Sequence, residues 1–105
     1  MGIEVAMTTE RGEPIQQVFD AQQVLTALAM GPWQGMSSSV CVRFIDPWGD
    51  AVFNQAQLPY LLSELRQSMA VATDPRVTEH LEKVCRLVEQ AQNKGMHTYV
   101  KFIGD

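Results

Sequence analysis

The stretch that says most about the fold is Ser39-Val-Cys-Val-Arg-Phe-Ile-Asp-Pro-Trp-Gly-Asp-Ala-Val-Phe-Asn54. Its first half is rich in β-branched and aromatic residues, and Val52 and Phe53 resume that character after an interruption. Pro47 and Gly49 favour a turn between the halves, because proline presets φ and glycine tolerates positive φ. We therefore predict a β-hairpin in which residues 40–45 pair with the strand that follows the turn.

The N-terminal third predicts two strands, at residues 3–8 and 15–19, and then a helix at residues 21–30. Asp20 is the expected N-cap of this helix, since aspartate accepts hydrogen bonds from the first free N–H groups. A competing interpretation merges residues 15–30 into one long helix. Both remain open at this point, and we favour the strand followed by a helix.

The C-terminal half predicts two helices and a last strand. Asn54 and Gln57 form a capping-box pattern, and leucines at helical spacing follow them. Asp74 is the expected cap of the second helix, and Gly95 its expected end. Apolar and polar residues then alternate through residues 96–103, as in a strand with one buried face.

These elements, in the order β-β-α-β-β-α-α-β, predict an α+β fold with a mostly antiparallel sheet that helices cover on one face. The length of 105 residues fits one domain spanning residues 1–105.

Composition and charge disfavour two classes of partner. The net charge is −4 and the basic residues are dispersed, whereas nucleic-acid binders carry a basic face. No run of about 18 apolar residues could span a membrane, and the N-terminus lacks the pattern of a signal peptide. We therefore expect a cytoplasmic protein that contacts neither nucleic acid nor membrane.

The two cysteines, Cys41 and Cys85, fall in a predicted strand and a predicted helix. Buried free thiols are the usual state of such residues in a cytosolic protein, and a disulfide would need the two elements to touch. Cys41 and His97 would form a nucleophile–base pair only if their strands were adjacent. No helix N-terminus or basic cluster precedes Cys41 to activate it, so a structural thiol is the better interpretation.

Asp46 and Asp50 form a carboxylate pair that lies outside the predicted helices, at the two ends of the predicted turn. Such a pair could serve acid–base chemistry or bind a divalent cation, but aspartate is also common in turns for its bonds to local N–H groups. The histidines, His80 and His97, lack zinc-ligand spacing. We expect no catalytic residue, no metal site and no cofactor, and we favour a protein that is not an enzyme.

Trp33 and Trp48 both lie in predicted loops. A loop tryptophan either folds back over the core or contacts a partner, where tryptophan often dominates the binding energy. The covering role is the commoner one across proteins, and both tryptophans remain candidates for contact with a partner.

Two segments resemble a group of small uncharacterised bacterial proteins: Phe44-Ile-Asp-Pro-Trp-Gly-Asp-Ala-Val-Phe-Asn54 and Tyr99-Val-Lys-Phe-Ile-Gly-Asp105. The proteins that these segments resemble are single-domain chains of similar length, some of them carried on mobile elements such as integron gene cassettes. The resemblance implies a bacterial, cytosolic, stand-alone product, and it implies no activity, substrate or catalytic residue.

We therefore expect a small binding protein that self-associates, with a homodimer as the first partner to test and an accessory or immunity-like role as one possibility. The alternative is a ligand-binding protein or enzyme with a pocket near the loop at residues 31–39, into which Asp46, Asp50, His97 and Tyr99 would converge. The candidate binding residues of the two hypotheses are Trp33, Trp48, Asp46, Asp50, His97 and Tyr99.

Overall fold

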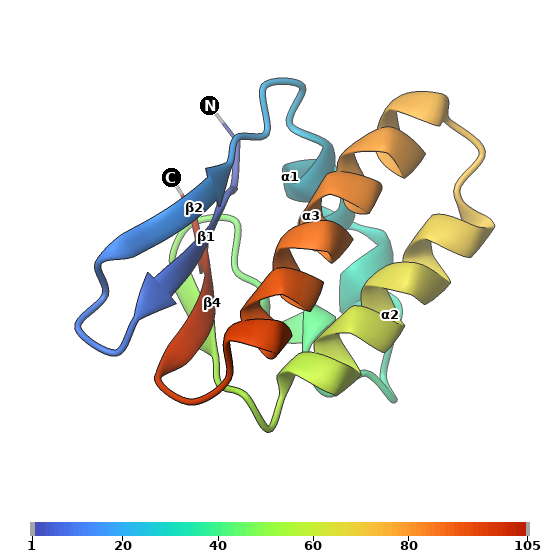
Figure 1. Ribbon diagram of the computed structural model, residues 1–105. Coiled ribbons are helices and arrows are strands. Elements are labelled where there is room, and N and C mark those ends of the chain that lie inside the picture. Colours follow the sequence, from blue (N-terminus) through green and yellow to red (C-terminus); the bar gives the residue numbers. More distant parts are fainter. Residues whose placement is uncertain (1, 105) are drawn as a thin grey trace.

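The computed structural model describes residues 2–104 and has a four-stranded sheet with three helices on one side of it (Figure 1). Its elements are β1 (Glu4–Thr9), β2 (Pro14–Val18), α1 (Val24–Met30), β3 (Asp50–Phe53), α2 (Leu58–Val71), α3 (Pro75–Lys94) and β4 (Thr98–Ile103), with 3-10 turns η1 (Pro32–Gly35) and η2 (Val42–Phe44). The predicted α+β class, an antiparallel sheet covered on one face by helices, is confirmed.

The sheet has the order β2-β1-β4-β3, and every neighbouring pair is antiparallel. Side chains alternate between its faces, so Val5, Met7, Val100 and Phe102 point together into the core, where they are buried. Phe102 meets Phe53 edge to face, with ring centroids 5.7 Å apart. The opposite face of the sheet is not covered by a helix (Figure 1).

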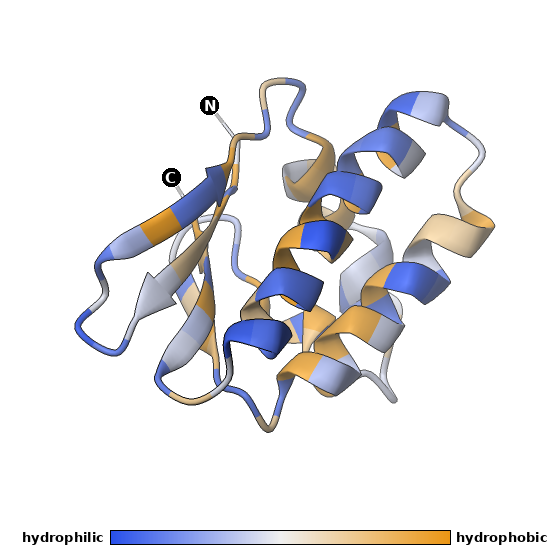
Figure 2. Ribbon diagram, in the orientation of Figure 1, coloured by the Kyte–Doolittle hydropathy of each residue, from blue (hydrophilic) through white to orange (hydrophobic). Residues whose placement is uncertain are grey.

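The helix α3 begins as the sequence predicts, whereas α2 begins at Leu58, one turn after the predicted cap Asn54. Asn54 and Gln57 exchange side-chain-to-backbone hydrogen bonds of 2.9 and 3.1 Å just before α2, and the Asp74 carboxylate accepts the Arg76 N–H at the start of α3. Gly95 ends α3 with φ of 82°, a conformation that favours glycine. Apolar positions of both helices face the core and polar positions of α3 face outward (Figure 2).

The predicted hairpin across residues 46–50 is wrong. Residues 40–45 form no strand, and three of them make the η2 turn, so the order of elements is β-β-α-β-α-α-β. The strand after the turn, β3, pairs with β4 instead. The physical reason is a carboxylate from α2, described below, that takes the N–H groups that residues 40–42 would need for pairing.

The interpretation of residues 15–30 as a strand and then a helix is confirmed, although α1 starts at Val24 rather than at residue 21. Gln23 precedes the helix with φ of 57°, which interrupts any continuous helix from β2 onward.

In the part of the chain that the structure describes, no helix has the length and apolar character needed to cross a membrane.

Candidate functional site

The two loop tryptophans have opposite environments. Trp33 lies in η1 with 1% of its surface exposed, and its indole N–H donates a 2.9 Å hydrogen bond to Ser68 Oγ of α2. Trp48 is 66% exposed. Trp33 therefore covers the core, and Trp48 is the tryptophan that a partner can reach.

The turn before β3 holds Trp48 at a corner of the sheet. The Asp46 carboxylate accepts the Trp48 N–H at 2.8 Å, so this aspartate organises the turn. Gly104, after β4, donates its N–H to the Gly49 carbonyl at 2.8 Å, and a Cβ on Gly104 would come within 2.5 Å of the same oxygen. Only glycine fits this close backbone contact, which fixes the turn against the end of β4.

The other predicted site residues do not share a pocket with Asp46. Asp50 pairs in register with Ile103 at one end of β4 and forms an ion pair with Lys101, with 3.5 Å between Oδ2 and Nζ. The other end of β4, Thr98, is about 17 Å from Ile103 at about 3.3 Å per strand residue, and His97 directly precedes it. There it contacts Glu10, with 2.8 Å between Nδ1 and Oε2. Tyr99 is half-buried within β4.

Exposed apolar side chains concentrate in the part of the chain that leads into β3. We call Val40, Phe44, Trp48 and Val52 the exposed apolar segment, since each of these large side chains is more than half exposed. The guanidinium carbon of Arg43 lies 4.6 Å from the centre of the Phe44 ring and covers part of it. The strand at the end of this segment, β3, has β4 on one side and no strand on its other side among residues 2–104. Its outer N–H and C=O groups are therefore open to pairing.

A buried carboxylate sets the shape of the start of this segment. Glu64, in α2, accepts hydrogen bonds from the N–H groups of Val40, Cys41 and Val42 at 2.8, 3.1 and 2.9 Å, and from the Ser39 hydroxyl at 2.7 Å. Burial alone would raise the pKa of Glu64, but these hydrogen bonds together hold it below its ordinary value. Glu64 is therefore an anion at neutral pH, and it anchors residues 39–42 to α2.

The same arrangement makes Cys41 unreactive. Burial, together with the nearby Glu64 charge, raises the pKa of the Cys41 thiol to about 11. Burial likewise raises the pKa of Cys85. Both cysteines are buried free thiols, and neither has the thiolate that nucleophilic chemistry requires.

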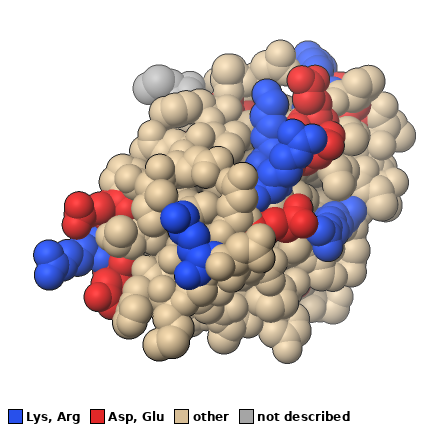
Figure 3. All heavy atoms as spheres, in the orientation of Figure 1, with Lys and Arg blue, Asp and Glu red and all other residues tan. Residues whose placement is uncertain are grey.

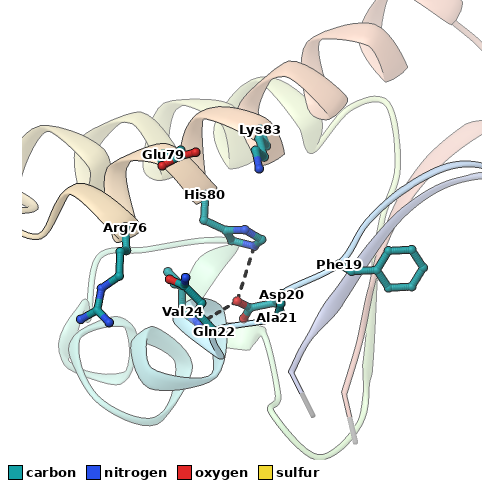
Figure 4. A pocket seen from close by; sticks show the side chains of 9 residues that line it. All are labelled: Phe19, Asp20, Ala21, Gln22, Val24, Arg76, Glu79, His80 and Lys83. Atoms are coloured by element: carbon teal, nitrogen blue, oxygen red, sulfur yellow. Dashed lines mark hydrogen bonds and ion pairs between the residues drawn. The ribbon is translucent and has the colours of Figure 1, made fainter.

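A pocket lined by several ionisable groups lies between α3 and the turn before α1 (Figure 4). Its floor is Asp20, whose two carboxylate oxygens accept the N–H groups of Val24 and Leu25, both at 2.7 Å. Asp20 thus provides hydrogen-bond acceptors for the free N–H groups in the first turn of α1, as expected of a capping residue. The helix nevertheless starts at Val24, later than the predicted residue 21. His80 points from α3 toward Asp20, and 3.8 Å separate Nε2 from Oδ1. This distance is too long for a hydrogen bond, and Nε2 has no other partner within residues 2–104.

The pocket is small and its charges are mixed. It encloses about 170 Å³, and Arg76, Glu79 and Lys83 line it on α3. The Arg76 guanidinium is already bound to Asp74, with 2.9 Å between Nη2 and Oδ2. His80 could exchange a proton here, but the lining contains no serine, threonine or cysteine that it could activate. Across residues 2–104, no three histidine, cysteine or acidic side chains lie together in a way that could hold a metal ion.

On the face shown in Figure 3, acidic and basic side chains are interspersed. Several form surface pairs, such as Arg86 with Glu82 at 2.8 Å and Arg66 with Glu89 at 3.2 Å.

We expect His80 to make stability depend on pH. Burial has the largest influence and lowers the pKa of His80; Asp20 opposes this shift and Lys83 adds to it. Because the native pKa lies below the value of about 6.5 of an unfolded chain, the unfolded state binds the proton more readily, and stability falls as the pH drops below about 6.5. The His80→Gln variant should lose this part of the dependence in urea denaturation between about pH 8 and pH 5. An unchanged pH dependence in the variant would contradict the assignment.

Comparison with known proteins adds no relative to this picture: no family model, curated protein or solved structure matches the chain.

Proposed function

We propose that the protein works by binding rather than by catalysis, as a small interaction module whose first partner is a second copy of itself. The observation that carries the proposal is Trp48, which is 66% exposed in the turn that leads into β3, a strand at one edge of the sheet. Large apolar side chains that gather on a surface mark interaction sites, and tryptophan is the residue most enriched among binding hot spots.

The proposed contact is made by the exposed apolar segment and by the free edge of β3. Two β3 strands can pair antiparallel across a two-fold axis, which joins two four-stranded sheets and satisfies the open backbone groups of both. Trp48 and Val52 of each copy would then lie next to the new strand pair. The opposite edge, β2, begins with Pro14, a residue that disfavours strand addition.

The enzyme hypothesis requires one pocket into which four side chains converge, and the positions of these residues do not support it. The four residues are Asp46, Asp50, His97 and Tyr99. Asp46 is committed to its turn, and Asp50 and His97 lie at opposite ends of β4. The binding hypothesis needs no such convergence, because its contact surface is a single continuous segment of chain.

The Trp48→Ala variant should stay folded but associate more weakly. Loss of a tryptophan anchor typically costs about 2 kcal/mol, and a two-fold dimer loses one anchor from each copy, so the dimer dissociation constant should rise by at least roughly 30-fold. Sedimentation equilibrium of the variant and the wild type measures this difference. Met96→Ala is the matched control, because Met96 is 80% exposed and lies outside the exposed apolar segment. Equal dissociation constants for wild type and Trp48→Ala would overturn the proposed interface.

A further inference from the structure

A separate groove lies at the end of the helical layer, where η1 and the end of α1 face the connection between α2 and α3. It encloses about 530 Å³ and is mainly apolar. The side chains that matter for its chemistry are Leu28, Trp33, Met36, Gln67, Val71 and Val77. The volume lies within the range of about 300–1,000 Å³ that is usual for sites of small molecules.

The inner wall of this groove is built into the core. Trp33 is held by its hydrogen bond to Ser68, and Leu28, Met36 and Val77 are partly buried against the core cluster. Val71, the last residue of α2, stands at the rim and is 79% exposed. The groove therefore exists without a ligand, so that binding would not require the chain to reorganise.

The charges around the groove select against ionic ligands. The one charged side chain in the lining of the groove is Asp74. Its carboxylate accepts the backbone N–H of Arg76 at 2.9 Å and is bound to the guanidinium of Arg76, so its charge is already paired. An ion placed here would lose water without gaining an opposite charge, which is costly.

Two polar groups of the lining can still form hydrogen bonds. The side chains of Gln67 and Thr73 make no hydrogen bond to any other residue in the described range 2–104. A ligand with one hydroxyl, carbonyl or amide group could bond to either of them while its apolar part covers Leu28 and Val77. A smaller hollow of about 240 Å³ shares Leu28 and Val77 with the groove and is also lined by Arg76.

We propose that this groove binds a neutral, mainly apolar small molecule that carries one hydrogen-bonding group. The inference is independent of self-association, because the groove contains no residue of the exposed apolar segment.

Titration of the full chain with two fluorescent probes of similar size tests the proposal: neutral N-phenyl-1-naphthylamine and anionic 8-anilino-1-naphthalenesulfonate. We expect the neutral probe to bind saturably at one molecule per chain and at least about tenfold more tightly than the anionic probe. Absence of saturable binding, or equal affinity for the two probes, would overturn the proposal.

Two variants locate the bound probe. Val71→Lys puts a charge at the rim and should weaken binding of the neutral probe at least about fivefold. Met96→Lys introduces the same charge at a residue of similar exposure outside the groove and should leave binding unchanged. Gln67→Trp fills the groove without adding charge and should also abolish binding, which keeps the test valid if Val71→Lys folds poorly. Equal effects of the two lysine variants would contradict the proposed site. Loss of a dimer in Val71→Lys would show that a second copy occupies the groove, and would equally contradict it.

Discussion

Replacing Glu64 by leucine should lower the free energy of unfolding by about 4 kcal/mol. The variant leaves the N–H groups of Val40, Cys41 and Val42 and the Ser39 hydroxyl without their acceptor. Each buried donor left unsatisfied costs about 1–3 kcal/mol, and relaxation of the segment would recover part of the sum. Urea denaturation followed by tryptophan fluorescence measures the loss.

The matched control is Glu89→Leu, the same substitution at an exposed residue of α3. Glu89 forms a surface ion pair with Arg66, with 3.2 Å between the charged atoms and both side chains about half exposed. Such pairs contribute roughly 0–1 kcal/mol, so the control should unfold close to the wild type. A similar loss in both variants would contradict the anchoring role of Glu64.

The effect of Glu64 should also depend on pH in a definite direction. Because the hydrogen bonds hold the native pKa of Glu64 below its unfolded value of about 4.3, its contribution is fully present above that pH and is lost as the pH falls through the lower native pKa. The difference in stability between wild type and Glu64→Leu should therefore shrink in acid. A constant difference down to about pH 2 would show that charge is not involved.

Replacing Trp33 by alanine should cost about 3–5 kcal/mol of stability, because it empties a large buried volume and removes the hydrogen bond to Ser68. Trp48→Ala should cost far less, since most of that side chain is already in water. Thermal melts of the two variants provide the comparison. If Trp48→Ala melted as low as Trp33→Ala, Trp48 would belong to the core and could not be a partner anchor.

Local patterns predicted most of the fold correctly. The helical spacing of leucines in α2, the capping box at Asn54 and the glycine at the end of α3 each act within a few residues, so the sequence displays them directly. The terminal strand β4 was also visible, because its alternation matches a sheet with one buried face.

The segment at residues 40–45 was missed because a long-range contact overrides its strand propensity. Its apolar, β-branched residues fit a strand, but Glu64 takes its backbone donors from more than twenty residues away. A trace of this contact exists in the sequence. Glu64 is three residues after Leu61 and four before Ser68, which places a carboxylate on the buried face of α2.

The candidate sites were only partly predictable for a similar reason. The turn role of Asp46 follows from local chemistry, whereas the choice between a buried and an exposed tryptophan depends on contacts such as that of Trp33 with Ser68. His80 could have been noticed, because it lies three residues after Val77 and four before Val84, on the inner face of α3. Its partner Asp20 comes from a different part of the chain, which spacing cannot reveal.

The mass of the wild-type chain in solution tests the central claim, self-association, most directly. Light scattering coupled to size-exclusion chromatography measures this mass. Loading concentrations from about 1 to about 200 µM cover the micromolar dissociation constants expected of a dimer of moderate affinity. We predict a mass that rises with concentration from the 11.7 kDa of one chain toward twice that value. A constant mass of 11.7 kDa up to the highest concentration would contradict the proposal.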